Sequence, residues 1–157
     1  MRVKNIIFED FVQYKKCSMF IGTCFCDWKC CKEANCNICQ NMPLAKSPII
    51  TIDDDELAYK YITNPLTSAI VYGGLEPLDQ FDELLASIDA FRKVTDDDIV
   101  IYTGFYPTEI SEKIFELQKR SNIIVKFGRF KPNANHIYDK ILGVELSSDN
   151  QWAEKIS

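Results

Sequence analysis

Short apolar runs alternate with segments of helical periodicity along most of the chain. The apolar runs are rich in β-branched and aromatic residues and are bounded by Gly, Pro, Asn or Asp, which is typical of buried strands. Between residues 78 and 94, by contrast, apolar side chains recur at intervals of three and four, as on one face of a helix. Strands are predicted at residues 3–8, as an edge strand, and at 18–22, 69–72, 99–102 and 123–127.

Two further helices are indicated by their end signals. Thr51 or Asp53 can cap a helix with an acidic first turn, and this helix should end near Thr63 because Pro65 disfavours helical geometry in the preceding residue. The last predicted helix covers residues 107–120 and has a proline in its first turn. Such alternation predicts an α/β fold with a parallel sheet, right-handed crossovers and functional loops at the carboxyl ends of the strands.

The composition is that of one α/β domain spanning residues 1–157, with 46% apolar and 26% charged residues. A formal net charge of -5 and a pI near 4.9 argue against a nucleic-acid partner, because phosphates attract a basic surface. The N-terminal segment does not resemble a signal peptide, and no apolar stretch reaches the roughly 18 residues of a membrane span. We therefore expect a cytoplasmic protein without a membrane partner.

Six of the seven cysteines lie in the segment 24–41, which we call the cysteine loop. Stable disulfides explain such a loop poorly, because the cytosol keeps thiols reduced and the number of cysteines is odd. Thiolates are the preferred ligands of zinc and of iron-sulfur clusters. The loop is therefore predicted to hold a metal centre, and a zinc site with four cysteine ligands is one alternative.

Three unusual loops each follow a predicted strand and are expected to share one face of the fold. The cysteine loop follows residues 18–22, GGLEP (73–77) follows the next core strand, and TGF (103–105) follows the one after it. The paired glycines allow a ligand to approach the backbone, and the carboxylate of Glu76 can accept hydrogen bonds from an ammonium group. Alone, GGLEP is more typical of an ordinary turn before a helix.

Several short motifs occur in order along the chain: a C-x3-C pair at 26–30, GGLEP, IVIYTGF (99–105), KFGRF (126–130) and LSSDNQ (146–151). The first two resemble the radical S-adenosylmethionine (SAM) superfamily, in which cysteines spaced C-x3-C-x2-C ligate three irons of a [4Fe-4S] cluster and a GGE-type motif contacts the amino group of SAM. The last three are similar to the TGY, DGPF-like and GSSNQ elements of the small anaerobic ribonucleotide reductase activating proteins.

The resemblance implies a single-domain, partial and open (βα) barrel of mainly parallel strands. It implies a [4Fe-4S] cluster and SAM as cofactors. The residues that it assigns to SAM binding are Gly73, Gly74, Glu76, Thr103 and Gly104.

The cysteine loop departs from the spacing of the superfamily. Cys26 and Cys30 supply C-x3-C, but Glu33 stands where the next cysteine would follow. Cys39 is the predicted third ligand, because Gln40 and Asn41 after it resemble the pair that often follows the last cluster cysteine in that family.

Alternatives to Cys39 remain open. Cys36 is the main one, since it forms a C-x2-C pair with Cys39. Cys31 is disfavoured because adjacent side chains diverge in an extended loop. Cys17 and Cys24 are interpreted as ordinary buried cysteines.

The activity implied by the resemblance is reductive cleavage of SAM to a 5′-deoxyadenosyl radical, which installs a glycyl radical on a partner such as anaerobic ribonucleotide reductase. A low-potential electron donor such as flavodoxin or ferredoxin is implied as well. Two alternatives are a small radical SAM enzyme that acts on a peptide or small molecule and a non-catalytic zinc or iron-sulfur module.

No catalytic or metal-binding role is predicted for the other candidate residues. The lone His136 is most simply a surface residue, and the acidic runs 53–56 and 96–98 are typical of helix caps and turns. Trp28 is expected either to shield the metal centre and contact an adenine, or only to anchor the loop.

Overall fold

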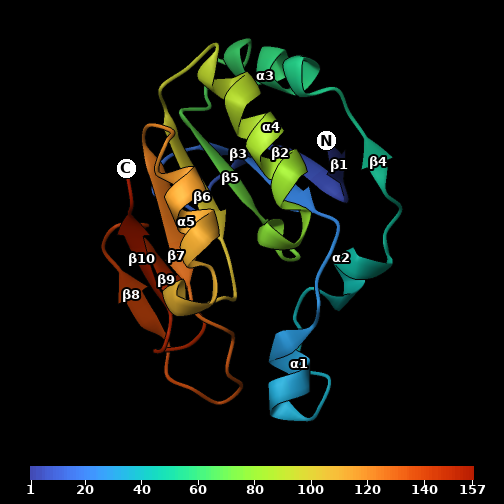
Figure 1. Cartoon of the computed structure of the whole chain (residues 1–157), viewed down its shortest axis with the longest axis vertical. Helices are drawn as coiled ribbons and strands as arrows, with labels where there is room; N and C mark the ends of the chain where they lie inside the picture. The colour runs from blue at the N-terminus through green and yellow to red at the C-terminus, as the bar shows by residue number, and fades with distance from the viewer.

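A six-stranded, mostly parallel sheet forms the centre of the computed structural model, which describes residues 1–157 (Figure 1). Four parallel strands lie side by side in chain order: β3 (Ser18–Thr23), β5 (Ala69–Gly74), β6 (Asp98–Tyr102) and β7 (Ile123–Phe127). An antiparallel strand closes each edge, β2 (Asn5–Asp10) beside β3 and β10 (Trp152–Lys155) beside β7. The predicted mixed α/β fold with a mainly parallel sheet is confirmed.

Smaller elements surround this sheet. Strands β1 (Arg2–Val3) and β4 (Ile50–Thr51) pair with each other, as do β8 (Ile137–Asp139) and β9 (Val144–Leu146). The connection between β3 and β5 also contains two short helices, α1 (Lys29–Ala34) and α2 (Met42–Lys46). Helix α1 extends from one end of the molecule, away from α3 and α4 (Figure 1).

Three longer helices follow the strands: α3 (Asp54–Ile62), α4 (Phe81–Arg92) and α5 (Ser111–Leu117). Asp53 is the N-cap of α3, and its side chain accepts hydrogen bonds from the backbone N–H groups of Asp55 and Glu56, at 3.0 Å each. The other two helices begin later than expected, because a 3-10 turn precedes each of them: η1 (Pro77–Gln80) and η2 (Pro107–Glu109). None of the helices has the length and hydropathy that a bilayer span requires.

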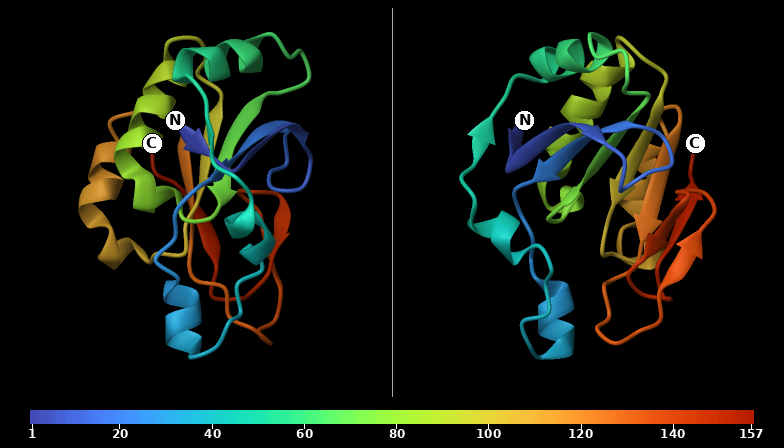
Figure 2. Two further views of the ribbon diagram at one scale, coloured as in Figure 1. Left: turned by 90° about the vertical axis from the view of Figure 1, so that its right-hand side faces the viewer. Right: turned by 180° about the vertical axis from the view of Figure 1, so that it is seen from behind.

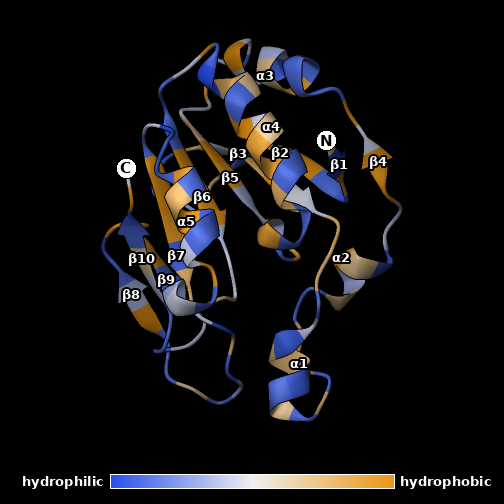
Figure 3. Cartoon of the chain, viewed as in Figure 1, coloured by the Kyte–Doolittle hydropathy of each residue, from blue (hydrophilic) through white to orange (hydrophobic).

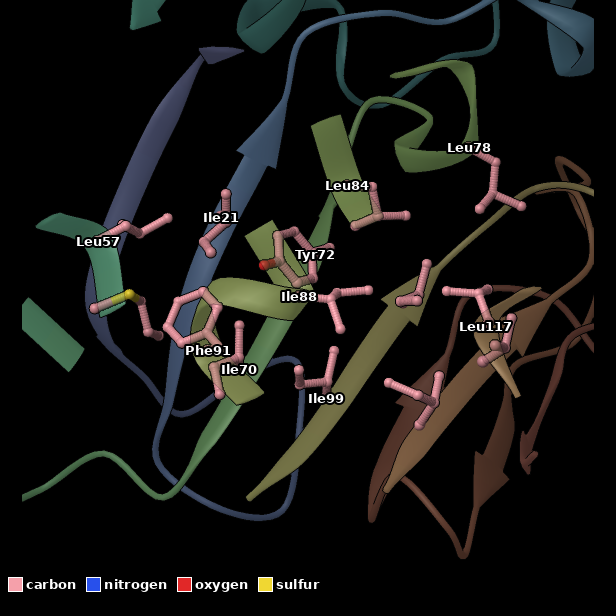
Figure 4. Packing of buried hydrophobic residues seen from close by; sticks show 14 of the residues in the cluster. Ile21, Leu57, Ile70, Tyr72, Leu78, Leu84, Ile88, Phe91, Ile99 and Leu117 are labelled. Atoms are coloured by element: carbon pink, nitrogen blue, oxygen red, sulfur yellow. The ribbon is translucent and has the colours of Figure 1, made fainter. Parts of the chain in front are cut away.

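The main core lies between the sheet and these three helices. Successive side chains of a strand point to opposite faces, so Ile70 and Tyr72 of β5 pack toward the helices, against residues such as Ile88 and Phe91 of α4 (Figure 4). Tyr72 is fully buried, and its hydroxyl shares a hydrogen bond of 2.8 Å with the hydroxyl of Ser87. The central strands are mostly hydrophobic, whereas α1 has both polar and apolar residues and buries none of them (Figure 3).

The opposite face of the sheet carries no long helix. Ala69 and Val71 point to this side, where they pack with Tyr14, Leu142 and Leu146 in a smaller cluster. The parallel strands are added in chain order toward one edge of the sheet, from β3 to β7. Because all the crossovers have the same handedness, strands added in one direction place every helix on the same face (Figure 2). The second face is therefore covered by loops and short strands instead of long helices.

Candidate functional site

A cavity of about 400 Å³ lies at the carboxyl end of the parallel strands. Phe20 and Tyr102, which belong to the face without long helices, form part of its wall. The rest of the wall comes from Val12 and Gln13, the cysteine loop, residues 74–76 of GGLEP, Thr103 and Gly104, the KFGRF segment, β9, Ser147 and Gln151. Gly73, which was also predicted to bind SAM, is buried in β5 and does not line the cavity. The loops that the sequence singles out are thus brought to one cavity, as expected from their positions after parallel strands.

Three thiols of the cysteine loop line this cavity: Cys26, Cys30 and Cys39. Cys31 and Cys36 instead line a separate outer hollow. The structure therefore groups the three predicted ligands at one cavity and places both alternatives at the other hollow, although Cys31 is near enough to Cys39 to contribute, after burial, to the raised pKa of Cys39.

The two remaining cysteines lie outside the cavity. Cys24 is buried, with 6% of its surface exposed, as expected. Cys17 is only partly buried and immediately precedes β3, at the end of the strand opposite the cavity.

The conformation of the loop differs from the irregular, extended segment that was expected. Cys30 and Cys31 lie in helix α1, where their side chains diverge because successive residues of a helix are rotated by about 100°. After the loop, Pro43 lies in the first turn of the short helix α2. Trp28 lines the outer hollow and not the cavity, so a role beside an adenine within the cavity is not indicated.

Backbone contacts fix the start of the cysteine loop against the GGLEP segment. The N–H of Glu76 donates to the carbonyl of Phe25 at 2.7 Å, and the N–H of Cys24 donates to the side chain of Gln80 at 2.7 Å. At the other end of the loop, the side-chain amide of Asn41 donates to the carbonyl of Gly74. Cys39 is thereby held near the glycine turn by a residue only two positions away.

The carboxylate of Glu76 joins GGLEP to the TGF loop. One oxygen accepts from the hydroxyl of Thr103 at 2.8 Å and from the N–H of Leu78 at 3.1 Å, and the other accepts from the N–H of Gly104 at 2.9 Å. Burial raises the pKa of Glu76 to about 7, although these three hydrogen bonds act in the opposite direction. One accepting position remains on the second oxygen, so the expected contact with an ammonium group stays a prediction.

Lys126 is a site residue that the sequence analysis did not select. Its side chain lines the cavity, is 6% exposed, and donates to the carbonyl of Gly128 at 2.9 Å. Burial lowers the pKa of Lys126 to about 8. The sequence pattern that could have indicated Lys126 is a lysine inside the apolar strand 123–127, because a central strand seldom buries an ammonium group without a role.

Glu33, which occupies the position of the missing cysteine, takes part in an ion pair. Its carboxylate lies 3.2 Å from the guanidinium of Arg129, which is 4% exposed and also binds Glu109. The same guanidinium lies over the ring of Tyr106, at 5.1 Å from its centre. Arg129 thus connects helix α1 to the segment after β6, across the edge of the cavity.

The KFGRF and LSSDNQ segments hold each other at the cavity wall. The side chain of Asn150 donates to the carbonyl of Arg129 at 2.8 Å, and that of Gln151 donates to the carbonyl of Gly128 at 3.2 Å. His136 lies outside this site, is 63% exposed in its side chain, and pairs with Glu145 at 2.7 Å, so its interpretation as a surface residue is confirmed.

The chemistry of the thiols fits a soft metal centre. Burial raises the pKa of Cys26 to about 12 and also raises the pKa values of Cys30 and Cys39. Buried thiolates become favourable only beside a cation, and a metal centre supplies that charge when it displaces the protons. Three thiolates at one cavity are a suitable ligand set for an iron-sulfur cluster or for zinc.

A second group of metal-binding atoms lies next to Cys26. The sulfur of Cys26 and carboxylate oxygens of Asp27 and Asp79 lie within 4.8 Å of one another. The carboxylate of Asp79 already accepts the N–H of Asp27 at 2.8 Å. The hydrogen bond gives these carboxylates a structural role, and the mixed set of one soft and two hard ligands indicates no particular metal.

The chain matches no family model, no curated protein and no solved structure.

Proposed function

We propose that this protein is a radical SAM protein that holds a [4Fe-4S] cluster on Cys26, Cys30 and Cys39. In this proposal it cleaves SAM reductively and installs a glycyl radical on a partner enzyme, such as an anaerobic ribonucleotide reductase. The observation that supports the proposal best is the shared cavity: three thiols, residues 74–76 of GGLEP and the Thr103–Gly104 segment line one space of about 400 Å³.

The order of the strands supports the barrel-like part of the proposal. The parallel strands follow one another in chain order, and α3, α4 and α5 all cover the same face of the sheet (Figure 2). A doubly wound sheet would instead have helices on both faces and a reversal of strand order. A partial (βα) barrel has its helices outside and its ligand inside, which is the arrangement that we propose here.

The residues around the cavity suit both cofactors. The thiolates of the three cysteines would hold the cluster, and the buried ammonium group of Lys126 would attract the carboxylate of SAM. Gly74 would present its backbone to the ligand, since it lines the cavity and has a φ of +83°, which residues other than glycine rarely adopt. When bound, a reduced [4Fe-4S] cluster supplies the electron that breaks the sulfonium bond of SAM.

The protein residues have positioning and protective roles. Glu76 fixes the Thr103–Gly104 backbone through its hydrogen bonds, and Gly104 leaves space beside the sulfur of Cys30, which would lie 3.8 Å from an added Cβ atom. Arg129 and Glu33 hold helix α1 against the opposite wall of the site. Together these contacts would restrict water around a reactive radical.

Exposed apolar residues at the cavity edge favour a protein partner over a small molecule. Phe11 and Val12 are each 69% exposed, and Val12 also contributes to the cavity wall. A partner loop that reaches the cavity would cover these side chains. A low-potential flavodoxin or ferredoxin would supply the electron in this proposal.

Anaerobic analysis of iron, sulfide and SAM cleavage tests this function. The protein is reconstituted with iron and sulfide, and 5′-deoxyadenosine is measured after addition of dithionite and SAM. We expect near-stoichiometric cluster content and SAM cleavage, both lost in Cys26→Ala, Cys30→Ala and Cys39→Ala. Cys17→Ala is the matched control and should retain both.

Specific outcomes would overturn the proposal. Tight zinc binding without a cluster would favour a non-catalytic zinc module. Full cluster content in Cys39→Ala would refute the ligand assignment. SAM cleavage that leaves no glycyl radical signal, by electron paramagnetic resonance, on a supplied glycyl radical enzyme would favour the small-molecule or peptide alternative.

A further inference from the structure

Cys31 and Cys36 form a pair of thiols outside the proposed cluster site. Both line the outer hollow, together with Trp28 and Met42, and neither lines the main cavity. Cys36 is exposed and Cys31 is partly exposed, so both sulfur atoms lie within reach of solutes. The chain therefore keeps two accessible thiols that the proposed cluster does not use.

The end of helix α1 brings these two residues together. Asn35 has a φ of 50°, in the left-handed region, and its N–H donates to the carbonyl of Lys32 at 3.2 Å. The N–H of Cys36 donates to the carbonyl of Cys31, also at 3.2 Å. These two hydrogen bonds define the Schellman motif, in which the side chains at the positions of Cys31 and Cys36 commonly contact each other.

The hydrogen bond limits the separation of the two residues. With standard bond lengths, an N···O distance of 3.2 Å between Cys36 and Cys31 allows a Cα···Cα distance of at most about 7.4 Å, reached only if all the atoms were collinear. The bent geometry of the motif makes the true separation smaller. Disulfides bridge Cα atoms that are roughly 4.4 to 6.8 Å apart, so the separation that this bent motif allows overlaps the range that a disulfide needs.

We infer that Cys31 and Cys36 are a redox-active dithiol that is converted to an intramolecular disulfide by exchange with a disulfide substrate, such as glutathione disulfide. The thiolate of one cysteine attacks the external disulfide and releases one thiol as the leaving group. The thiolate of the other cysteine then attacks the mixed disulfide and releases the second thiol. Two cysteine thiols are oxidised to one disulfide, and one external disulfide is reduced to two thiols.

This modification site goes beyond the proposed function and does not depend on it. The disulfide would close a short loop around the end of helix α1, next to Cys30, without using any proposed cluster ligand. Such a bond is compatible with a reducing compartment, where disulfides are mostly transient. It would respond to the thiol–disulfide balance around the protein.

Differential alkylation under anaerobic conditions tests the inference. The full-length protein, both as purified and after metal removal, is equilibrated with mixtures of reduced and oxidised glutathione and quenched in acid. Free thiols are blocked with one reagent, disulfides are reduced, and the released thiols are labelled with a second reagent. Tandem mass spectrometry then reads the state of each cysteine.

We expect Cys31 and Cys36 to become oxidised together, with a loss of two hydrogen atoms and no bound glutathione. In Cys36→Ser, Cys31 should instead carry one glutathione, because the second attack is no longer available. Cys17→Ser is the matched control and should leave the disulfide unchanged.

Separate glutathione adducts on Cys31 and Cys36 in the unaltered protein would overturn the inference. A disulfide between Cys31 and Cys39, or two thiols that stay reduced at every glutathione ratio, would do the same. The iron content of the Cys31→Ser/Cys36→Ser double variant separates this result from the cluster proposal. Full iron content is expected, whereas its loss would mean that these residues are ligands and not a redox pair.

Discussion

Replacing Glu76 with glutamine tests how burial of this carboxylate affects stability. Burial raises the pKa of Glu76 from its ordinary value of 4.5 to about 7, so the folded protein retains a proton that the unfolded chain releases in that window. The folded state binds more protons than the unfolded state there, and the free energy of unfolding must therefore fall as the pH rises from 4.5 to 7. Glutamine does not titrate and removes this dependence.

The magnitude follows from the size of the pKa shift. Between about pH 5.5 and pH 8, ionisation of the buried carboxylate should lower the unfolding free energy by about 2 kcal/mol, at roughly 1.4 kcal/mol per pKa unit. The glutamine variant also loses one hydrogen bond, because its amide group cannot accept from the N–H of Gly104 while its oxygen accepts from Thr103 and Leu78. That loss costs about 1 to 3 kcal/mol.

Urea unfolding of the cluster-free protein measures both effects. We expect Glu76→Gln to be less stable than the unaltered protein at pH 5.5, and the difference to shrink by about 2 kcal/mol at pH 8. Asp55→Asn is the control, because the Asp55 side chain is 72% exposed. If the unfolding free energies of the unaltered protein and Glu76→Gln changed in parallel with pH, burial would not raise the pKa of Glu76, and the reasoning would be refuted.

Two other substitutions test the cavity wall. Gly74→Ala should lower the free energy of unfolding by about 1 to 2 kcal/mol or more, because Gly74 has a φ of +83° and an added Cβ atom would lie 2.5 Å from Leu44. Gly104→Ala is the matched control in the same urea titration, since an added Cβ atom there would meet its nearest neighbour at 3.6 Å, an ordinary contact. An equal loss of stability in Gly74→Ala and Gly104→Ala would contradict the reasoning. Lys126→Met should raise the unfolding free energy of the cluster-free protein at pH 7 by about 2 kcal/mol. Burial lowers the pKa of Lys126 from 10.5 to about 8, and the substitution removes the free-energy cost of burying the ammonium group. The loss of the hydrogen bond to Gly128 offsets part of this gain. The gain should decrease as the pH rises above 8, and a variant that is destabilised at pH 7 would show that the lysine is favourably placed without a ligand.

The sequence alone determines the order of the elements and the convergence of the loops. Strand and helix periodicity are local properties, and the handedness of crossovers leaves little choice of topology once the strands are known. The residues after β3, β5 and β6 therefore had to meet at one end of the sheet. The N-cap at Asp53 was equally predictable, because a capping bond joins residues only two and three positions apart.

Only the tertiary structure decides which thiols share the cavity. The path of the cysteine loop depends on contacts between distant residues, such as Asn41 with Gly74 and Glu33 with Arg129, and no sequence spacing contains that information. The sequence also concealed helix α1, since a helix of six residues that buries no side chain has no apolar periodicity to reveal it.

The same limit applies to the charged residues of the site. Lys126 lies in a strand whose side chains are buried on both faces, and its burial follows from neighbours contributed by β6, β9 and the segment after β7. Glu76 is buried because the TGF loop folds over it, 27 positions further along the chain. Ionisation depends on this surrounding volume, which a linear sequence does not specify, and so the electrostatics of the cavity could be known only from the folded chain.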